Sequence, residues 1–435
     1  MFPSKTKELL IFSLPIIAGQ VGQTLFSIGD IIVAGHYSKE MASALGIASM
    51  ILVPFIMFGL GLTFAIGPII SKKRGAKEST EGILWTSICS SFLISVIVII
   101  SLFIFIYFID YINFPANIGA QIKSYLIITS PSVLFALVFQ AYKEYLQSFH
   151  DTLFANITIL IFNIINVLLN IMLVFGVGII PELGIIGAAY ATLISRLLMA
   201  VVLAIYTHLK HTEKNTFNIK IFKDIFTIGI PISTATLLEV LAFTTVTVIV
   251  GKMGIITSAA HNIVLNFSSM TFMVPLGLAS AVSVKIAHSL GENNYSELHE
   301  YTKASLFISV SFMTITAFIY SFFPAYVMKL GTSDQQVINY GVGLLFYVAL
   351  FQIPDGLQVT LWGVLRGMQT TKWPMILGFI ANWVISLPLG IYLAFKLNME
   401  AAGLWAGLAL GLSLMSVGLS IIYYRKLKNL KELIH

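Results

Sequence analysis

Three acidic side chains fall where an acidic side chain is costly. Asp30, Glu239 and Asp355 lie deep inside long apolar stretches, whereas most of the nineteen Asp and Glu residues fall in polar breaks or at the ends of such stretches. A charge at the centre of a membrane costs about 3 kcal/mol, so it usually faces a wet cavity or pairs with a cation. Only Arg196 and Arg366 are expected at comparable depth, too few to pair all three. The three acids are therefore candidates for binding a monovalent cation or carrying a proton.

The neighbours of two of these acids favour a functional role. Gly29 precedes Asp30 and lets another helix or an ion approach. Asp355 lies in the sequence Pro354-Asp355-Gly356, where the proline frees a backbone carbonyl and the glycine is expected to loosen the helix. Freed carbonyls beside a carboxylate suit sodium, and a partly desolvated carboxylate suits a proton carrier. An ordinary proline kink is the alternative interpretation of Pro354.

Polar side chains also recur in two apolar stretches of the N-terminal half. Asn163, Asn166 and Asn170 follow one another along a single stretch, and Thr192 lies in the next. Asn166 and Asn170 are four residues apart and share one face of a helix. We expect these side chains to lie near Asp30. Hydrogen bonding between helices would explain each of them equally well.

Enzymatic motifs are missing from the sequence. There is no Walker-A loop, GxSxG or HExxH sequence, and the single cysteine, Cys89, excludes a disulfide framework. The net charge of +6 comes from short clusters between apolar stretches, not from a continuous basic surface, which argues against a nucleic-acid partner. We therefore expect no enzyme and no cofactor.

The elements that carry these residues are membrane spans. The chain is 57% hydrophobic and 10% charged, with a mean hydropathy of +0.92, so lipid must be its main solvent. In lipid each backbone amide needs a partner within its own helix, which predicts an all-α membrane protein. Twelve apolar stretches are long enough to span a bilayer: 9–33, 44–70, 83–109, 122–148, 154–178, 183–209, 222–250, 258–286, 302–323, 338–366, 373–396 and 401–424.

Basic residues orient these twelve spans. With the N-terminus inside, nineteen of the 25 Lys and Arg residues fall in inner segments and five in outer ones, with Arg196 inside a span. This asymmetry predicts that both termini are cytoplasmic.

A sequence repeat divides the chain into two lobes of six spans. Residues 15–75 align without a gap on 231–291 at an offset of 216, with thirteen identities that include prolines and glycines. The polar link 210–221 separates the N-lobe, 1–209, from the C-lobe, 222–435. Six spans per repeat give a parallel pair of lobes, which predicts a substrate path between them. The acids are not duplicated, because Asp30 aligns with Val246 and Glu239 with Gln23; the N-lobe therefore holds one deep acid and the C-lobe two.

Several long blocks resemble the multidrug and toxic compound extrusion (MATE) transporters, and in particular their NorM-like branch. The resemblance spans nearly the whole chain and is carried by SIGDIIVAGHYS (27–38), GLGLTFAIGPIISKKRGA (59–76), NIINVLLNIMLVFG (163–176), LGIIGAAYAT (183–192), LLEVLAFT (237–244), AAHNIVLNFSSMTFMVPLGLASAVSVKIAHSLGE (259–292) and PDGLQVTLWGVLRG (354–367).

The resemblance implies a MATE fold of two pseudo-symmetric six-helix lobes and export of drugs or organic cations by antiport with Na⁺ or H⁺. The functional acids of the family match Asp30, Glu239 and Asp355, and an aromatic near the C-lobe cation matches Phe272. Asn170 stands where the archaeal branch has an acid, which favours coupling in the C-lobe. If the chain uses sodium, Glu239 and Asp355 would be its ligands.

The combined interpretation is a multidrug efflux transporter of the bacterial inner membrane. We expect it to export amphipathic organic cations, such as drugs and dyes, as a monomer in the lipid bilayer and without nucleic acid. A flippase for a lipid-linked precursor is the alternative. Flippases tend to present cationic cavities to pyrophosphate groups, whereas the deep charges here are mainly acidic.

Overall fold

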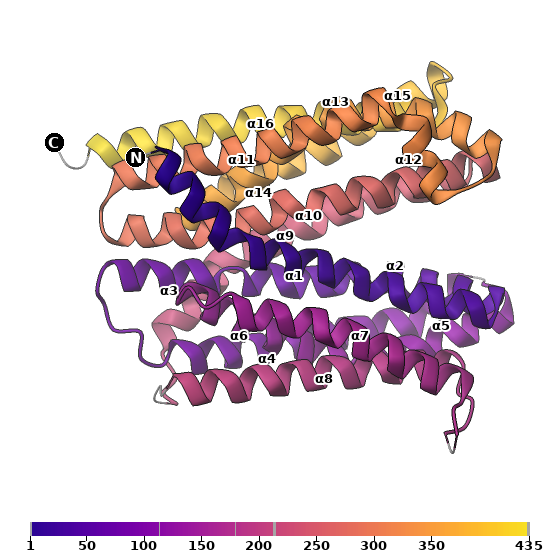
Figure 1. Cartoon of the computed structure of the whole chain (residues 1–435), viewed down its shortest axis with the longest axis horizontal. Coiled ribbons are helices and arrows are strands. Elements are labelled where there is room, and N and C mark those ends of the chain that lie inside the picture. The colour runs from indigo at the N-terminus through magenta and orange to yellow at the C-terminus, as the bar shows by residue number, and fades with distance from the viewer. Residues whose placement is uncertain (1, 113, 179, 212–214, 433–435) are drawn as a thin grey trace. The chain divides into compact units, whose positions relative to one another are not determined.

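The computed structural model describes residues 2–112, 114–178, 180–211 and 215–432, and their regular structure is entirely helical (Figure 1). The helices are α1 (Phe2–Tyr37), α2 (Lys39–Thr63), α3 (Ile66–Gly75), α4 (Ile83–Phe108), η1 (Ile109–Ile112), α5 (Ala116–Thr129), α6 (Ser132–Ser148), α7 (Leu153–Phe175), α8 (Ile185–Lys210), α9 (Ile219–Gly251), α10 (Ile255–Gly291), α11 (Tyr295–Phe322), α12 (Pro324–Gly331), α13 (Gln335–Gly367), α14 (Lys372–Phe379), η2 (Ile380–Ser386), α15 (Leu387–Lys396) and α16 (Glu400–Glu432).

The predicted spans correspond to these helices. Among the described residues, eleven helices are long and apolar enough to cross a membrane. A twelfth span is formed by α5 and α6 together, which meet at a bend of 44°. Pro131 lies at this bend, where its missing N–H interrupts the helical hydrogen bonds. The prediction of twelve spans is confirmed when this bent pair is counted as one.

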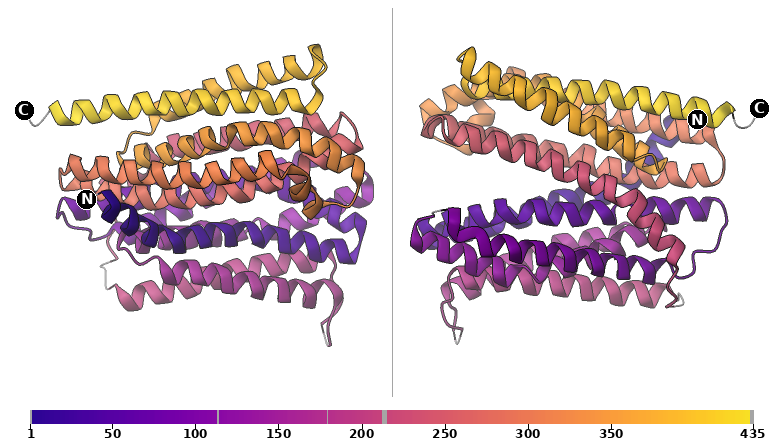
Figure 2. Two further views of the ribbon diagram at one scale, coloured as in Figure 1. Left: turned by 45° about the horizontal axis from the view of Figure 1, so that its top comes forward. Right: turned by 180° about the vertical axis from the view of Figure 1, so that it is seen from behind.

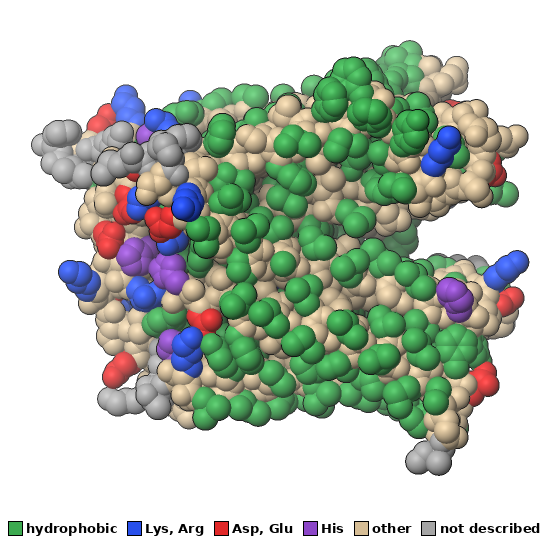
Figure 3. Space-filling view, viewed as in Figure 1, with side chains coloured by type: hydrophobic (Ala, Val, Ile, Leu, Met, Phe, Trp, Pro, Cys, Tyr) green, Lys and Arg blue, Asp and Glu red, His purple; other side chains and the backbone are tan. Residues whose placement is uncertain are grey.

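Helix α7 shows how one span serves both lipid and core. Ile161, Ile164 and Leu168 point outward, and Ile164 is 65% exposed. Asn166 and Asn170, on the opposite face, are fully buried. Figure 3 shows the same division at larger scale, because hydrophobic side chains cover the middle of the helices whereas charged ones gather toward the helix ends. An apolar exterior with polar groups inside is expected when lipid is the solvent.

The chain forms two compact units that differ at their edges from the predicted lobes. The C-terminal unit comprises Met1–Ile17, Gly75–Lys77 and Thr234–His435, and the N-terminal unit comprises Ala18–Arg74 and Glu78–Ser233. One change of unit lies inside α9, after Ser233. A second change of unit lies inside α1, after Ile17. Each of these two helices therefore contributes its first part to one unit and its second part to the other.

The two changes of unit are equivalent under the sequence repeat. A Cβ atom on Gly61 would lie 2.5 Å from the Cα of Ser233, and a Cβ on Gly277 would lie 2.7 Å from the Cα of Ile17. Both pairs are related by the offset of 216 residues. Only glycine permits such a close approach of two helix backbones. The repeat predicted from the sequence thus has a counterpart in the packing of each unit.

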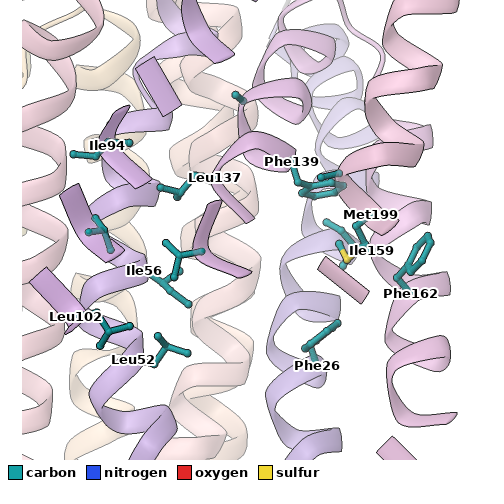
Figure 4. Packing of buried hydrophobic residues seen from close by; sticks show 14 of the residues in the cluster. Phe26, Leu52, Ile56, Ile94, Leu102, Leu137, Phe139, Ile159, Phe162 and Met199 are labelled. Atoms are coloured by element: carbon teal, nitrogen blue, oxygen red, sulfur yellow. The ribbon is translucent and has the colours of Figure 1, made fainter. Parts of the chain in front are cut away.

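Each unit has its own apolar core. In the N-terminal unit, Figure 4 shows Leu52, Ile56 and Leu102 of α2 and α4 on one side, and Phe139 and Met199 of α6 and α8 on the other, all from one buried cluster. In the C-terminal unit, α13 packs against α10, α11 and α16 (Figure 2). Central α13 carries Asp355, so this packing determines what surrounds that acid.

Candidate functional site

Asp30 lies at the centre of a buried hydrogen-bond network in the N-terminal unit. Its side chain, on α1, is 5% exposed. Asn170 Nδ2 on α7 donates to Asp30 Oδ1 at 2.6 Å, and Thr192 Oγ1 on α8 donates to Asp30 Oδ2 at 3.2 Å. Asn170 Nδ2 also lies 3.1 Å from the backbone oxygen of Asn166. The structure therefore brings Asn170 and Thr192 to Asp30, with Asn166 beside Asn170, whereas Asn163 bonds elsewhere along α1.

A close helix contact makes this network possible. A Cβ atom on Gly29 would lie 2.9 Å from Cγ2 of Val167, so α7 packs directly against α1 beside Asp30. Further along the same contact, Asn163 Nδ2 donates to the backbone oxygen of Gly22 at 2.7 Å. The expectation that Gly29 admits a neighbouring helix is thus met by α7.

Glu239 and Asp355 form a second acidic centre, in the C-terminal unit. Gln358 Nε2 on α13 donates to Glu239 Oε1 on α9 at 2.9 Å. Asp355 lies one turn before Gln358 on the same face of α13 and is 5% exposed, so the Glu239 carboxylate that Gln358 holds lies at the face of α13 that also carries Asp355. No side chain in the described part of the chain donates a hydrogen bond to Asp355. A pair of carboxylates in this arrangement favours a bound cation or a shared proton.

None of the three deep carboxylates has a cationic partner among the described residues, where every ion pair joins other groups. Arg196 donates instead to Ser132 Oγ at 2.9 Å, although it is near enough to attract Asp30. Arg366 donates to Ser283 Oγ at 3.2 Å. Structural ion pairs therefore do not account for these three acids.

The surroundings of Asp355 differ in one respect from the prediction. Helix α13 continues without interruption through Pro354, although the proline cannot donate to the preceding turn. Gly356 lies at a close contact between two helices. A Cβ atom there would lie 2.6 Å from Cγ of Met313, and Ser309 Oγ donates to the Gly356 carbonyl at 3.0 Å. The glycine therefore allows α11 to pack closely against this turn of α13.

The aromatic candidate and a helix irregularity lie in the same unit. Phe272 is half-buried on α10, and its ring contacts neither a cation nor another ring within the described residues. Its neighbour Thr271 accepts a hydrogen bond from Gln352. Close to Glu239, Trp383 Nε1 donates to the backbone oxygen of Leu238 at 3.0 Å. Trp383 lies in η2, a π-helical segment of the kind that often occurs at functional sites.

Some polar residues that are buried in the structure were not predicted as site candidates from the sequence. Gln352 and Gln358 are completely buried, yet a glutamine in an apolar stretch carries no charge to mark it. Lys143 and Glu144 lie near the end of the predicted span 122–148, and in α6 they are 1% and 3% exposed. The signal that could have found them is the spacing of polar residues along α6, where Gln140, Glu144 and Gln147 recur at helical intervals.

Comparisons with known proteins agree with this architecture. The MatE family pattern matches residues 15–172 and 231–392, which begin at the two equivalent prolines. A probable multidrug resistance protein NorM of Photorhabdus laumondii is 29% identical over 432 residues, which cover 96% of this chain and 94% of that protein. The multidrug resistance protein NorM of Vibrio vulnificus is 28% identical over 430 residues, with 95% and 93% covered.

A solved structure shows the same fold. The outward-facing conformation of a multidrug resistance MATE family transporter of the MOP superfamily superposes with a TM-score of 0.89 at 18% identity, covering 98% of this chain and 97% of that one. Because the family pattern covers most of the chain, the assignment does not depend on any single relative. The chain belongs to the MatE family and is an all-helical, multi-pass membrane transporter, not an enzyme.

Proposed function

We propose that this transporter exports amphipathic, mostly cationic drugs and dyes by antiport with Na⁺ or H⁺. Its relatives are named as multidrug resistance proteins, and the deep acidic charges of this chain suit cationic cargo of that class. The observation that carries the proposal is the set of three deep carboxylates, none of which forms an ion pair in the described part of the chain. Such acids attract cations from water and leave room for an exchangeable ion.

Glu239 and Asp355 form the coupling site in this proposal. When both carboxylates are ionised they repel each other, so binding of a sodium ion or a proton lowers the free energy of the pair. Asp30 assists protonation or drug release from the N-terminal unit, with Asn166, Asn170 and Thr192 as its polar neighbours. Phe272 offers a π-face that can hold a monovalent ion.

The location follows from the relatives and from the charges of the loops. We place the protein in the bacterial inner membrane as a monomer, with both termini in the cytoplasm. The inner segments hold most of the Lys and Arg residues, which are retained on the cytoplasmic side. Acidic rather than basic deep charges argue against pyrophosphate-bearing cargo, and so against a flippase.

Uptake of ethidium into everted vesicles, in which an exporter carries its cargo into the lumen, tests this proposal when sodium and pH gradients are imposed separately. We expect one of the two gradients to drive uptake, and Asp355→Asn to reduce the rate by at least about 100-fold, because only the carboxylate carries the charge that binds the ion. Asp110→Asn is the matched control, since Asp110 forms an ion pair with Lys123 at an exposed position. Full activity of Asp355→Asn would contradict the assignment of the coupling site.

A further inference from the structure

Three polar residues follow one another along one face of α13. Gln352, Asp355 and Gln358 are three residues apart, so their side chains lie on successive turns of the same helix. Both glutamines are completely buried. The amide nitrogen has two partners in Gln352 and one in Gln358, whereas the amide oxygen Oε1 of each is buried without one. The two glutamines are therefore chemically alike, but their partners are different.

Gln352 joins helices and does not touch an acid. Its Nε2 lies 3.2 Å from Thr271 Oγ1 on α10 and 2.9 Å from Thr316 Oγ1 on α11. The Thr271 hydroxyl donates to the carbonyl of Ser268, and the Thr316 hydroxyl to that of Met313. Because both hydroxyl protons are used, both threonines can only accept here, which fixes the orientation of the Gln352 amide. This residue stabilises the packing of three helices.

Gln358 touches the acid itself. Its Nε2 donates to Glu239 Oε1 at 2.9 Å, and this is the only side-chain hydrogen bond that reaches Glu239 among the described residues. The backbone before Glu239 is anchored separately, through Trp383 and the carbonyl of Leu238. The position of the carboxylate relative to α13, and so relative to Asp355, therefore depends on Gln358. A hydrogen bond to a charged acceptor is also stronger than a neutral one.

We propose that Gln358 is a positioning residue of the coupling site. It holds the Glu239 carboxylate beside Asp355, so that the two acids are already oriented when the coupling ion binds. The inference rests on the proposed function of Glu239 and Asp355. Without Gln358, the Glu239 side chain gains rotamers that turn away from Asp355, and the ion must order it on binding. The effect is therefore on ion binding and not on drug binding.

The experiment compares Gln358→Leu with Gln352→Leu. Each variant replaces a completely buried glutamine on the same face of α13 by a side chain of similar size, so each removes buried amide hydrogen bonds. In everted vesicles we measure the rate of ethidium uptake against the concentration of the ion that drives the parent protein. For Gln358→Leu we expect the half-maximal sodium concentration to rise about tenfold, or the half-maximal pH to move by about one unit, with the KM for ethidium unchanged. For Gln352→Leu we expect less protein in the membrane but the ion dependence of the parent.

An equal ion dependence of the two variants would overturn the inference. Where Gln358→Leu does not reach the membrane, the exchange Glu239→Gln with Gln358→Glu retains an amide–carboxylate hydrogen bond and places the acid on α13. We expect this double variant to transport at least about fivefold faster than Glu239→Gln alone, and no gain would contradict the positioning role. The proposed function fails separately, if Asp355→Asn retains ion-driven efflux.

Discussion

The two deep carboxylates that accept side-chain hydrogen bonds, Asp30 and Glu239, accept them from neutral donors. Asp30 receives hydrogen bonds from an asparagine and a threonine, and Glu239 receives one from a glutamine. A buried acid paired with arginine would be neutralised permanently, whereas neutral donors stabilise it without removing its charge. An acid of this kind can exchange its ion in each transport cycle. The choice of amide and hydroxyl donors is thus part of the proposed chemistry.

The two donors of Asp30 should contribute unequally. Asn170 donates at 2.6 Å and Thr192 at the longer distance of 3.2 Å. We expect Asn170→Leu to slow ethidium efflux about tenfold at equal amounts of protein in the membrane, since it removes the shorter hydrogen bond to a charged group. Thr192→Val, which preserves shape, should slow efflux by about twofold to threefold. A larger effect of Thr192→Val would contradict the assignment.

The sequence predicted the acids better than their partners. Asp30, Glu239 and Asp355 are recognisable because a charge in an apolar stretch is rare. Asn170 was found near Asp30 because asparagines recur at helical spacing in α7. Gln358 was not found, because its role depends on a contact with a residue 119 positions away in the sequence. Tertiary contacts of this kind have no local sequence pattern.

At the scale of elements, ion pairs and hydrogen bonds between charged side chains join the first turns of α1 to other helices of the C-terminal unit. Glu8 accepts hydrogen bonds from Lys285 Nζ at 2.8 Å and from Tyr301 at 2.7 Å. Lys5 forms an ion pair with Glu297, and Lys285 lies 5.0 Å from the ring centre of Phe12. These groups come from α1, α10 and α11, all within the same unit. These contacts hold the first turns of α1 against α10 and α11.

Removal of one charge from this cluster should lower stability measurably. Glu8→Gln leaves Lys285, whose side chain is 11% exposed, without its nearest counter-charge. We expect the free energy of unfolding to fall by about 1–2 kcal/mol and the melting temperature in detergent to fall by about 2–4 °C. Glu432→Gln is the control, because the pair Lys428–Glu432 is exposed and contributes at most about 0.5 kcal/mol. Equal melting temperatures of the two variants would show that the cluster contributes nothing.

At the scale of the whole molecule, the spans and their repeat were predictable and the limits of the compact units were not. Hydropathy locates helices because lipid selects apolar residues along each span. It does not reveal that α1 and α9 each change unit partway along, after Ile17 and Ser233. That feature depends on which helix backbones approach most closely. The repeat of Gly61 at Gly277, 216 residues later, was a sign of it, but the sequence alone did not say what the glycines contact.

The repeat gives these glycines a matched control within the same chain. Gly35 and Gly251 are also related by the offset of 216, and a Cβ atom on either would meet nothing within 4 Å, whereas at Gly61 and Gly277 it would lie under 3 Å from a backbone atom. We expect Gly61→Ala and Gly277→Ala each to lower the free energy of unfolding by about 1–3 kcal/mol, because the facing helix must move. Gly35→Ala and Gly251→Ala should leave it unchanged or slightly higher, since alanine favours a helix over glycine. Thermal melts of the four variants in detergent provide the measurement. If all four variants had the same melting temperature, the two close helix contacts would not be what holds α1 and α9 in their units. A lower melting temperature of Gly61→Ala and Gly277→Ala alone would show that the two copies of the repeat share a packing requirement as well as a sequence.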